Sequence, residues 1–179
     1  MSDFVAIIGA GNGGCAIAAH IARKGAKVKL CDLFPQYVEG IIEAGNVITL
    51  TDDGVTSEQK LAYVGTDVAT TVKDAQLIMV VTPSFTHKMI AEAVCAYLED
   101  GQVIVLNPGR TGGAVEFMAT LRKLGCTKKV TVAEASTLIY SCRKTGPASV
   151  GIFGTKKELT IGSLPGNEID NVLALVNPY

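Results

Sequence analysis

The sequence has little of what a nucleic-acid-binding protein needs. It contains no tryptophan and only 6% aromatic residues, and its 16 Lys and Arg residues are balanced by 17 Asp and Glu residues. A net charge of -1 provides no basic surface to follow a phosphate backbone, and few rings are available to stack on bases. We therefore expect no nucleic-acid partner.

Paired cysteines are also missing. The five cysteines are odd in number and scattered, without a CxxC pair, at Cys15, Cys31, Cys95, Cys126 and Cys142. This usage excludes a disulfide framework and gives no zinc-site spacing. We expect a reduced, cytoplasmic protein without a bound metal.

No apolar run approaches the roughly 20 residues that a membrane-spanning helix requires. The most apolar stretch, residues 4–22, contains four glycines, Asn12 and His20, and no basic residue precedes it as in a signal peptide. We expect a soluble protein that does not bind membranes.

Short apolar runs alternate with longer amphipathic segments along the 179 residues, 48% of which are hydrophobic. This pattern is typical of parallel strands joined by helices, and the length suits one domain over residues 1–179. It predicts an α/β fold of the Rossmann type, a doubly wound and mostly parallel sheet. The expected strands are residues 4–8, 27–31, 77–82, 103–106 and 130–133, and the expected helices are residues 13–24, 35–44, 86–98, 113–124 and 167–176.

Two antiparallel hairpins are expected in addition. The first joins VITL to KLAYV through a DDG turn and extends or caps the sheet. The second joins ASVGIF to ELTIGSL through GTKK.

The sequence IIGAGNGG places glycines in GxGxxG spacing between a strand and a helix, the arrangement of a dinucleotide-binding turn. In such a turn, Gly9 allows the tight bend, Gly11 lets the backbone approach a pyrophosphate, and Gly14 permits close packing of helix on strand. The helix N-terminus offers free N–H groups to phosphate oxygens. The candidate phosphate-binding residues are therefore Gly9, Gly11, Asn12, Gly13 and Gly14.

Asp32 directly follows the second expected strand, 23 residues after Gly9. A carboxylate at this place accepts hydrogen bonds from the adenosine ribose and repels a 2′-phosphate, which favours NAD over NADP as the cofactor. The alternative is that Asp32 only caps the turn before Pro35.

Thr82, Pro83 and Ser84 follow the next core strand, at the sheet edge where ligands of parallel sheets bind. They are candidates for contact with the ribose or nicotinamide, and the alternative is an ordinary turn with capping residues. His87 comes one turn later and is expected to be a solvated surface residue rather than a general acid or base.

A second glycine-rich loop, LNPGRTGGA, follows the strand VIVL and reaches the same edge. It lacks the GK[ST] sequence of a nucleoside-triphosphate loop. Either it is a turn at Pro108, with Thr111 capping the next helix, or Asn107 and Arg110 face the substrate.

A third segment, VAEASTLIYSCRKTG, carries Thr137 and Cys142 after another strand. Its polar groups in an apolar frame suit a pocket wall. The alternative is a buried connection in which Arg143 pairs with Glu134.

Three of these segments, GAGNGGCAIAAHIARKG, LNPGRTGGAVEF and EASTLIYSCRKTGPASV, resemble the N-terminal domain of the octopine/nopaline (opine) dehydrogenase family. The resemblance implies reductive coupling of an amino acid to a 2-keto acid with NADH or NADPH. It implies that Gly9, Gly11, Asn12 and Asp32 hold the dinucleotide. Thr82 and Pro83 would lie near the nicotinamide, and the segment from Thr137 to Cys142 would border the amino-acid pocket.

In that family a helical C-terminal domain supplies the catalytic histidine and closes the cleft. The resemblance thus implies that residues 1–179 are the cofactor-binding part, carry no catalytic residue and are inactive alone. The alternatives are an NAD-binding sensor or complex subunit, and a reductase of the glycerol-3-phosphate or ketopantoate type. A homodimer is left open.

Overall fold

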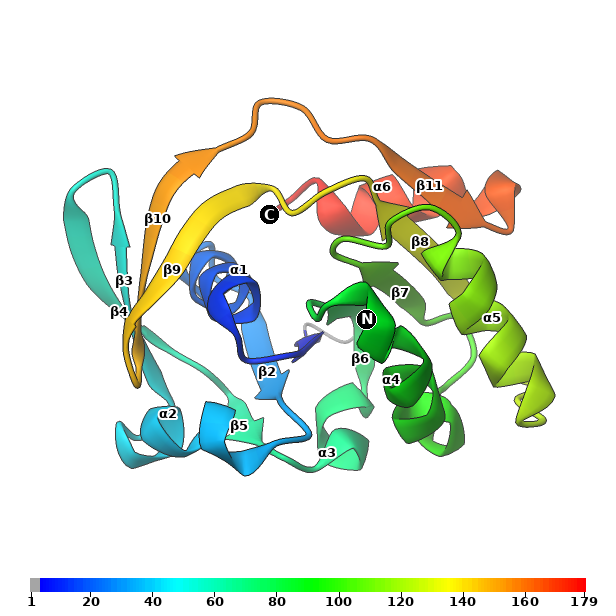
Figure 1. The fold of residues 1–179 in the computed structure, drawn as a ribbon, viewed down its shortest axis with the longest axis horizontal. Helices are drawn as coiled ribbons and strands as arrows, with labels where there is room; N and C mark the ends of the chain where they lie inside the picture. The colour runs from blue at the N-terminus through cyan, green and yellow to red at the C-terminus, as the bar shows by residue number, and fades with distance from the viewer. Residues whose placement is uncertain (1–3) are drawn as a thin grey trace.

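The computed structural model describes residues 4–179, which form two sheets with helices around them (Figure 1). The larger sheet has seven strands in the order β11-β8-β7-β6-β1-β2-β5. These strands are β1 (Phe4–Ile8), β2 (Lys27–Cys31), β5 (Tyr63–Gly65), β6 (Ala75–Val80), β7 (Val103–Leu106), β8 (Thr131–Ala135) and β11 (Ile161–Leu164). All neighbours are parallel except β8 and β11. The Rossmann-type, mostly parallel sheet is as predicted.

The chain winds outward from β1 in both directions. From β1 it passes to β2 on one side, and it later returns to place β6 on the other side. In doubly wound sheets ligands bind beyond the carboxyl ends of the strands at this reversal of strand order. The topology therefore places the expected site between the ends of β1 and β6.

Alternate residues of β1 pack into two different cores. Val5 and Ile7 belong to one apolar cluster, whereas Ala6 and Ile8 belong to the other. Since side chains alternate along a strand, the two clusters lie on opposite faces of the sheet. Both faces are covered, which is why the central strands β7, β6 and β1 are apolar except for Gln76.

The helices divide between these two clusters. The first cluster receives buried side chains from α1 (Asn12–Arg23), α2 (Glu39–Glu43) and α6 (Ile169–Val176). The second receives them from α3 (Val68–Val72), α4 (His87–Val94) and α5 (Gly113–Lys123). No helix in residues 4–179 is long and apolar enough to cross a bilayer.

The smaller sheet has four strands in the order β4-β3-β10-β9 and curves around α1 (Figure 1). They are β3 (Val47–Asp52), β4 (Val55–Lys60), β9 (Tyr140–Gly146) and β10 (Ser149–Thr155). Side chains at the end of α1 fasten this sheet: Arg23 forms an ion pair with Asp52, and the His20 ring stacks on Tyr140 with 5.3 Å between ring centroids.

The first predicted hairpin forms at the DDG turn but with a different second strand, and the second predicted hairpin does not form. The strand after the DDG turn is the polar segment Val55–Lys60, whereas Tyr63–Gly65, which begins within KLAYV, joins the large sheet beside β2. ASVGIF pairs with β9 and β3, and the segment of ELTIGSL that forms a strand, β11, pairs with β8. Pairing between distant segments decided these partners, and the local pattern does not record it.

Three of the predicted helices are interrupted or shortened. Residues 35–44 form a 3₁₀ turn (Pro35–Tyr37) followed by α2, and residues 86–98 form α4 between the 3₁₀ turns Ser84–Thr86 and Cys95–Tyr97. The last helix is the 3₁₀ turn Gly166–Glu168 followed by α6, and α3 was not predicted.

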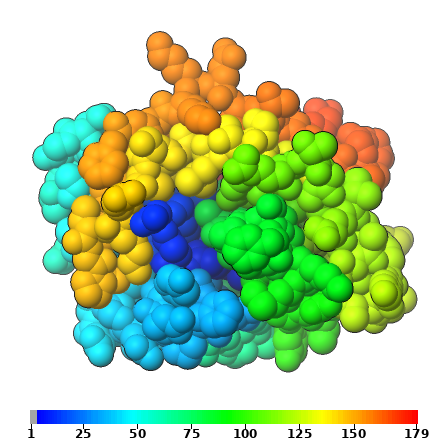
Figure 2. Space-filling view, in the orientation of Figure 1, coloured from blue at the N-terminus to red at the C-terminus, as the bar shows by residue number. Residues whose placement is uncertain are grey.

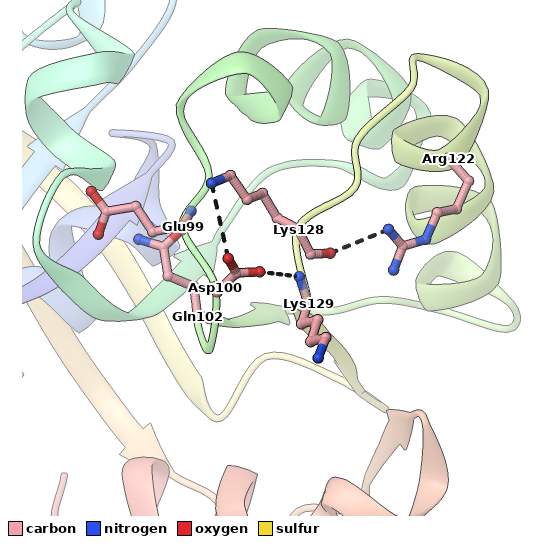
Figure 3. A network of polar contacts seen from close by, with 6 residues as sticks. All are labelled: Glu99, Asp100, Gln102, Arg122, Lys128 and Lys129. Atoms are coloured by element: carbon pink, nitrogen blue, oxygen red, sulfur yellow. Dashed lines mark hydrogen bonds and ion pairs between the residues drawn. The ribbon is translucent and has the colours of Figure 1, made fainter.

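The amino ends of β7 and β8 are held by a polar network at the edge opposite the expected site (Figure 3). The Gln102 side chain donates to the carbonyls of Val72 and Ala75 at 2.8 and 2.9 Å. The Asp100 carboxylate accepts from the Lys129 N–H at 2.7 Å. These bonds satisfy strand ends far from the cleft described below, so their role is structural.

Candidate functional site

A cleft of about 830 Å³ lies where the carboxyl ends of β1, β2, β6 and β7 meet. In the space-filling view the blue N-terminal segment lies at the bottom of a hollow bordered by light-blue, green and yellow segments (Figure 2). The cleft is lined by Ile8, Gly9, Gly11, Asn12, Gly13, Asp32, Leu33, Phe34, Gln36, Tyr37, Val81, Thr82, Pro83, Ser84, Phe85, Thr86, Met89, Ile90, Asn107, Pro108, Arg110 and Leu138. Four features singled out in the sequence thus meet in one place: the glycine-rich turn, Asp32, the segment from Thr82 to Ser84 and the second glycine-rich loop.

The glycine-rich turn has no room for side chains at two positions. Gly9 has φ +108°, and a Cβ there would lie 2.5 Å from the Val81 carbonyl oxygen. A Cβ on Gly14 would lie 1.7 Å from the Gly9 carbonyl oxygen, so α1 packs directly on the turn. A Cβ on Gly11, in contrast, would meet nothing within 4 Å. The turn is closed toward the sheet and open toward the cleft.

Helix α1 begins at the floor of the cleft with its N–H groups free of internal partners. Its first helical bond runs from the Cys15 N–H to the Gly11 carbonyl at 3.0 Å, so the preceding N–H groups of residues 12–14 lie before the ladder starts. The first turn holds no acidic residue, and no side chain caps it. This terminus therefore keeps its partial positive charge for an anion.

Asp32 is fixed by backbone groups on both sides. Its side chain is 9% exposed, Oδ2 accepts from the Ala10 N–H at 2.8 Å, and Oδ1 accepts from the Phe34 N–H at 3.0 Å. Asp32 thus does cap its own turn, as the alternative reading held, and it also orients the glycine-rich turn. Each oxygen has a further lone pair with which to accept from a ligand hydroxyl.

Thr82, Pro83 and Ser84 line the opposite wall. The Thr82 hydroxyl is buried and has no hydrogen-bond partner among residues 4–179, which leaves a polar atom of the wall unsatisfied. An ordinary turn is also present, since the Thr86 hydroxyl donates to the Pro83 carbonyl at 2.7 Å. Phe85 follows with 86% of its surface exposed at the mouth of the cleft.

The second glycine-rich loop brings Asn107 and Arg110 to the cleft. Asn107 is 9% exposed and donates to the Val105 carbonyl at 3.1 Å, and Arg110 is exposed with φ +59°. The loop is supported by Glu134: a Cβ on Gly109 would lie 2.1 Å from the Glu134 Cβ. The missing side chain makes room for that support.

Glu134 also occupies the N-terminus of α5. Its carboxylate accepts from the N–H groups of Gly112 at 3.3 Å and Ala114 at 2.7 Å. The capping residue is therefore not Thr111, and Glu134 bonds to backbone rather than to Arg143, which is exposed on β9. Since a protein carboxylate already meets this helix end, the loop is not a second phosphate cradle.

Thr137 and Cys142 lie outside the described lining of the cleft. The Thr137 hydroxyl accepts from the Lys156 ammonium at 3.0 Å, and the Cys142 thiol lies 3.5 Å from the Asn12 carbonyl oxygen. Leu138, between them in sequence, does line the cleft. The substrate roles of Thr137 and Cys142 stay predictions.

His87 is not the solvated residue expected from the sequence. It is fully buried between the Thr82 segment and the second glycine-rich loop, with Nδ1 3.5 Å from the position of a Cβ on Gly113. Burial lowers its pKa, against smaller opposite effects of the Thr82 backbone, Glu116 and Glu134. The amphipathic pattern did not reveal this because His87 lies at the first position of α4, under the loops.

Several lining residues were missed. Phe34, Gln36 and Tyr37 border the Asp32 side of the cleft, and Phe85 and Met89 border the Thr82 side. Their signal was available: aromatic residues directly after a strand's carboxyl end lie at the ligand edge of a parallel sheet. Residues 4–179 bring together no group of three or more His, Cys, Asp or Glu side chains that could hold a metal ion.

The chain is similar to known dehydrogenases. The chain is 36% identical over 164 residues to the opine dehydrogenase of Arthrobacter sp. (strain 1C), covering 92% of this chain and 45% of that protein. It is 27% identical over 177 residues to the octopine dehydrogenase of Pecten maximus, covering 93% and 43%. It therefore spans less than half the length of these relatives.

A solved structure of octopine dehydrogenase with NADH and L-arginine superposes with a TM-score of 0.78 at 23% identity, over 89% of this chain and 41% of that one, and so shares its fold. The family model described as NAD-dependent glycerol-3-phosphate dehydrogenase N-terminus matches residues 4–121. The chain belongs to this family of NAD-dependent dehydrogenase N-terminal domains, and within it is similar to opine and octopine dehydrogenases.

Proposed function

We propose that the cleft binds NAD(H), and that the chain is the cofactor-binding part of an opine-type dehydrogenase. Such an enzyme couples an amino acid to a 2-keto acid and reduces the product with hydride, which the nicotinamide supplies when bound. The observation that carries this proposal is the meeting of an open Gly11 backbone, a free helix N-terminus and an oriented Asp32 in one cleft.

The residues present fit a dinucleotide. Gly11, Asn12 and Gly13 would hold the pyrophosphate, since the α1 N–H groups lie there and no acid opposes a phosphate in that turn. Asp32 would accept from the adenosine ribose, with Phe34 and Tyr37 beside the adenine. These aromatic rings are about half exposed and so offer faces to a base.

NAD is the proposed form of the cofactor. Asp32 is held rigidly by Ala10 and Phe34, so it cannot turn away from a 2′-phosphate without losing two hydrogen bonds. The negative charges of a 2′-phosphate and of the buried Asp32 carboxylate would repel each other, which costs binding free energy. The free-energy difference favours the ribose with its 2′-hydroxyl.

Thr82, Pro83 and Ser84 are the proposed neighbours of the nicotinamide end, because they lie on the wall facing the glycine-rich turn. Asn107 and Arg110 are the proposed contacts for a substrate carboxylate. Arg110 is the one guanidinium of the described lining, and a guanidinium binds a carboxylate with two parallel hydrogen bonds.

The opine-type substrate class is proposed because the opine dehydrogenase match covers more of the chain than the family model does. The family model ends at residue 121, before β8 and β9, whereas the opine dehydrogenase match covers 92% of the chain. A reductase of glycerol-3-phosphate is the second candidate, favoured by the family description. The two are separated by assaying oxidation of NADH, with the complete coding sequence expressed, against amino acid plus pyruvate or against dihydroxyacetone phosphate.

We further propose that residues 1–179 alone bind the cofactor without turnover. The described lining contains no imidazole, ammonium or thiol, and both oxygens of its carboxylate, Asp32, already accept backbone N–H groups. Hydride transfer to an imine needs an aligned proton donor. Measurable turnover of NADH with pyruvate and an amino acid by this chain would reject this part of the proposal, and its absence with intact NADH binding would support it.

A further inference from the structure

Strand β9 is fastened to the first residue of helix α1, at the rim of the cleft. The Asn12 side-chain Oδ1 accepts from the Lys144 backbone N–H at 2.8 Å, across 132 positions of sequence. The Cys142 thiol lies against the carbonyl of the same asparagine. The second sheet thus reaches the proposed phosphate-binding turn through a short polar tether.

The tether carries a cation to this rim. From Asn12 the Lys144 side chain extends to the Tyr37 carbonyl, with its ammonium 3.4 Å from the oxygen. Asn12 and Tyr37 both line the cleft. The Lys144 backbone therefore lies at the glycine-rich turn and its ammonium at the Tyr37 edge of the cleft, although Lys144 itself is not among the lining residues.

This cation has no acidic counterpart. Within residues 4–179 no carboxylate forms an ion pair with Lys144, and Lys144 itself is half-buried between the exposed Arg143 and Thr145. The positive charge of Lys144 acts on Cys15 of α1. Burial raises the pKa of the Cys15 thiol to about 11, and the charge of Lys144 acts in the opposite direction. An ammonium without a carboxylate partner in the described residues, on a strand tied to a free helix N-terminus, makes this rim attractive to an anion.

We infer that Lys144 is a further cofactor-binding residue, whose ammonium pairs with the pyrophosphate of the dinucleotide over the glycine-rich turn. The inference rests on the proposed binding of NAD(H). A 2′-phosphate has the same chemistry, but Asp32 would repel it, whereas the tether to Asn12 holds the Lys144 backbone at the helix end, where the pyrophosphate would lie. The pyrophosphate carries two negative charges, and the helix end supplies only about half a positive charge.

A matched control lies next to Lys144 in the sequence. Arg143 is exposed, and because side chains alternate along a strand it points to the other face of β9. Lys144→Met and Arg143→Met therefore remove the same charge from neighbouring positions. Neither touches the tether, since the Lys144 backbone N–H makes that bond.

The experiment measures Kd for NADH and NADPH by calorimetric titration of the full chain, at several salt concentrations. Lys144→Met is expected to weaken both cofactors about tenfold at low salt and to flatten the dependence of log Kd on log salt. Lys144→Arg is expected to retain affinity, and Arg143→Met is expected to resemble the wild type. Thermal unfolding of each variant reports folding, and Lys144→Gln replaces Lys144→Met if the latter does not fold.

Each result decides the inference. Loss confined to NADPH would assign Lys144 to the 2′-phosphate and overturn it, as would equal effects of Lys144→Met and Arg143→Met. If the wild type binds NADH and Lys144→Met binds equally well, the inference fails while the proposed function stands. If the wild type does not bind NADH at all, the proposed function itself fails.

Discussion

The Asp32 carboxylate accepts a hydrogen bond from the Ala10 N–H at 2.8 Å, which ties the end of β2 to the glycine-rich turn after β1. One side chain thus sets both the ribose end and the phosphate end of the proposed cofactor site. Because its second oxygen is held by Phe34, the carboxylate has a single orientation. Preorganisation of this kind lowers the entropic cost of binding.

Replacing Asp32 with Asn is expected to weaken NADH binding about tenfold and to narrow the difference between NADH and NADPH. The amide keeps the size of the side chain but removes the charge that repels a 2′-phosphate, and its NH₂ cannot accept from backbone N–H groups. Calorimetric titration with both cofactors measures the ratio. An unchanged ratio of the two Kd values would contradict the assignment of Asp32 to the ribose.

Two glycines of the same turn should separate folding from binding. Gly14→Ala places a Cβ 1.7 Å from the Gly9 carbonyl oxygen and is expected to lower the free energy of unfolding by about 3 kcal/mol. Gly11→Ala meets open space and is expected to change stability by less than about 1 kcal/mol.

In a binding measurement, Gly11→Ala is the variant that should show the defect. The Gly11→Ala methyl projects where the backbone is open to the cleft, so NADH affinity should fall although the protein folds normally. Urea unfolding gives the stability and fluorescence titration gives the affinity. Normal affinity in Gly11→Ala would show that the pyrophosphate does not approach this residue.

Glu134→Gln is expected to destabilise the protein by about 1–2 kcal/mol, because the carboxylate that accepts from Gly112 and Ala114 loses its charge at a helix N-terminus. Glu116→Gln is the matched control, an exposed acid in the first turn of the same helix, and should cost less than about 1 kcal/mol. Equal destabilisation of the two variants in urea unfolding would show that the hydrogen bonds of Glu134 at the α5 N-terminus add no more stability than an exposed charge does.

Stability should fall in mildly acidic solution. Burial lowers the pKa values of His87 and His20 from 6.5 in the folded state, so the unfolded chain binds protons first as pH falls. The contribution of the two histidines to the free energy of unfolding is fully present above about pH 6.5. It is lost as the pH decreases toward the folded-state pKa values, by at most about 1.4 kcal/mol per pH unit for each histidine. Urea unfolding at pH 7.5 and 5.5 measures this.

The His87→Gln variant isolates one of the two groups. Its free energy of unfolding should depend less on pH than that of the wild type, with the remaining dependence due to His20 and the carboxylates. If the two curves run parallel between pH 7.5 and 5.5, His87 does not titrate in the way that its burial requires.

The sequence predicted best what is local. The order strand, glycine turn, helix, strand and acid lies within residues 4–32, and each step has its own residue signal, so β1, α1, β2 and Asp32 were placed correctly. The second sheet was missed because β3 pairs with β10, about 100 residues away, and because β4 is a polar, exposed strand that resembles a loop. Local pattern carries no information on such partners.

The candidate site shows the same limit. Asn107 and Arg110 reach the cleft as the strand order required, but the role of Glu134 under their loop depends on β8 lying beside β7. Tyr37 was assigned only to the helix expected over residues 35–44, and Phe34 was not proposed as a lining residue, although both follow soon after Asp32. His87 was misplaced because burial at a helix start depends on the loops packed over it.

Calorimetric titration of NADH into residues 1–179 tests the central claim most directly. The account predicts saturable binding at one site per chain, with a Kd below about one millimolar and with weaker binding of NADPH. Absence of any binding at millimolar NADH, by a chain shown to be folded, would contradict it.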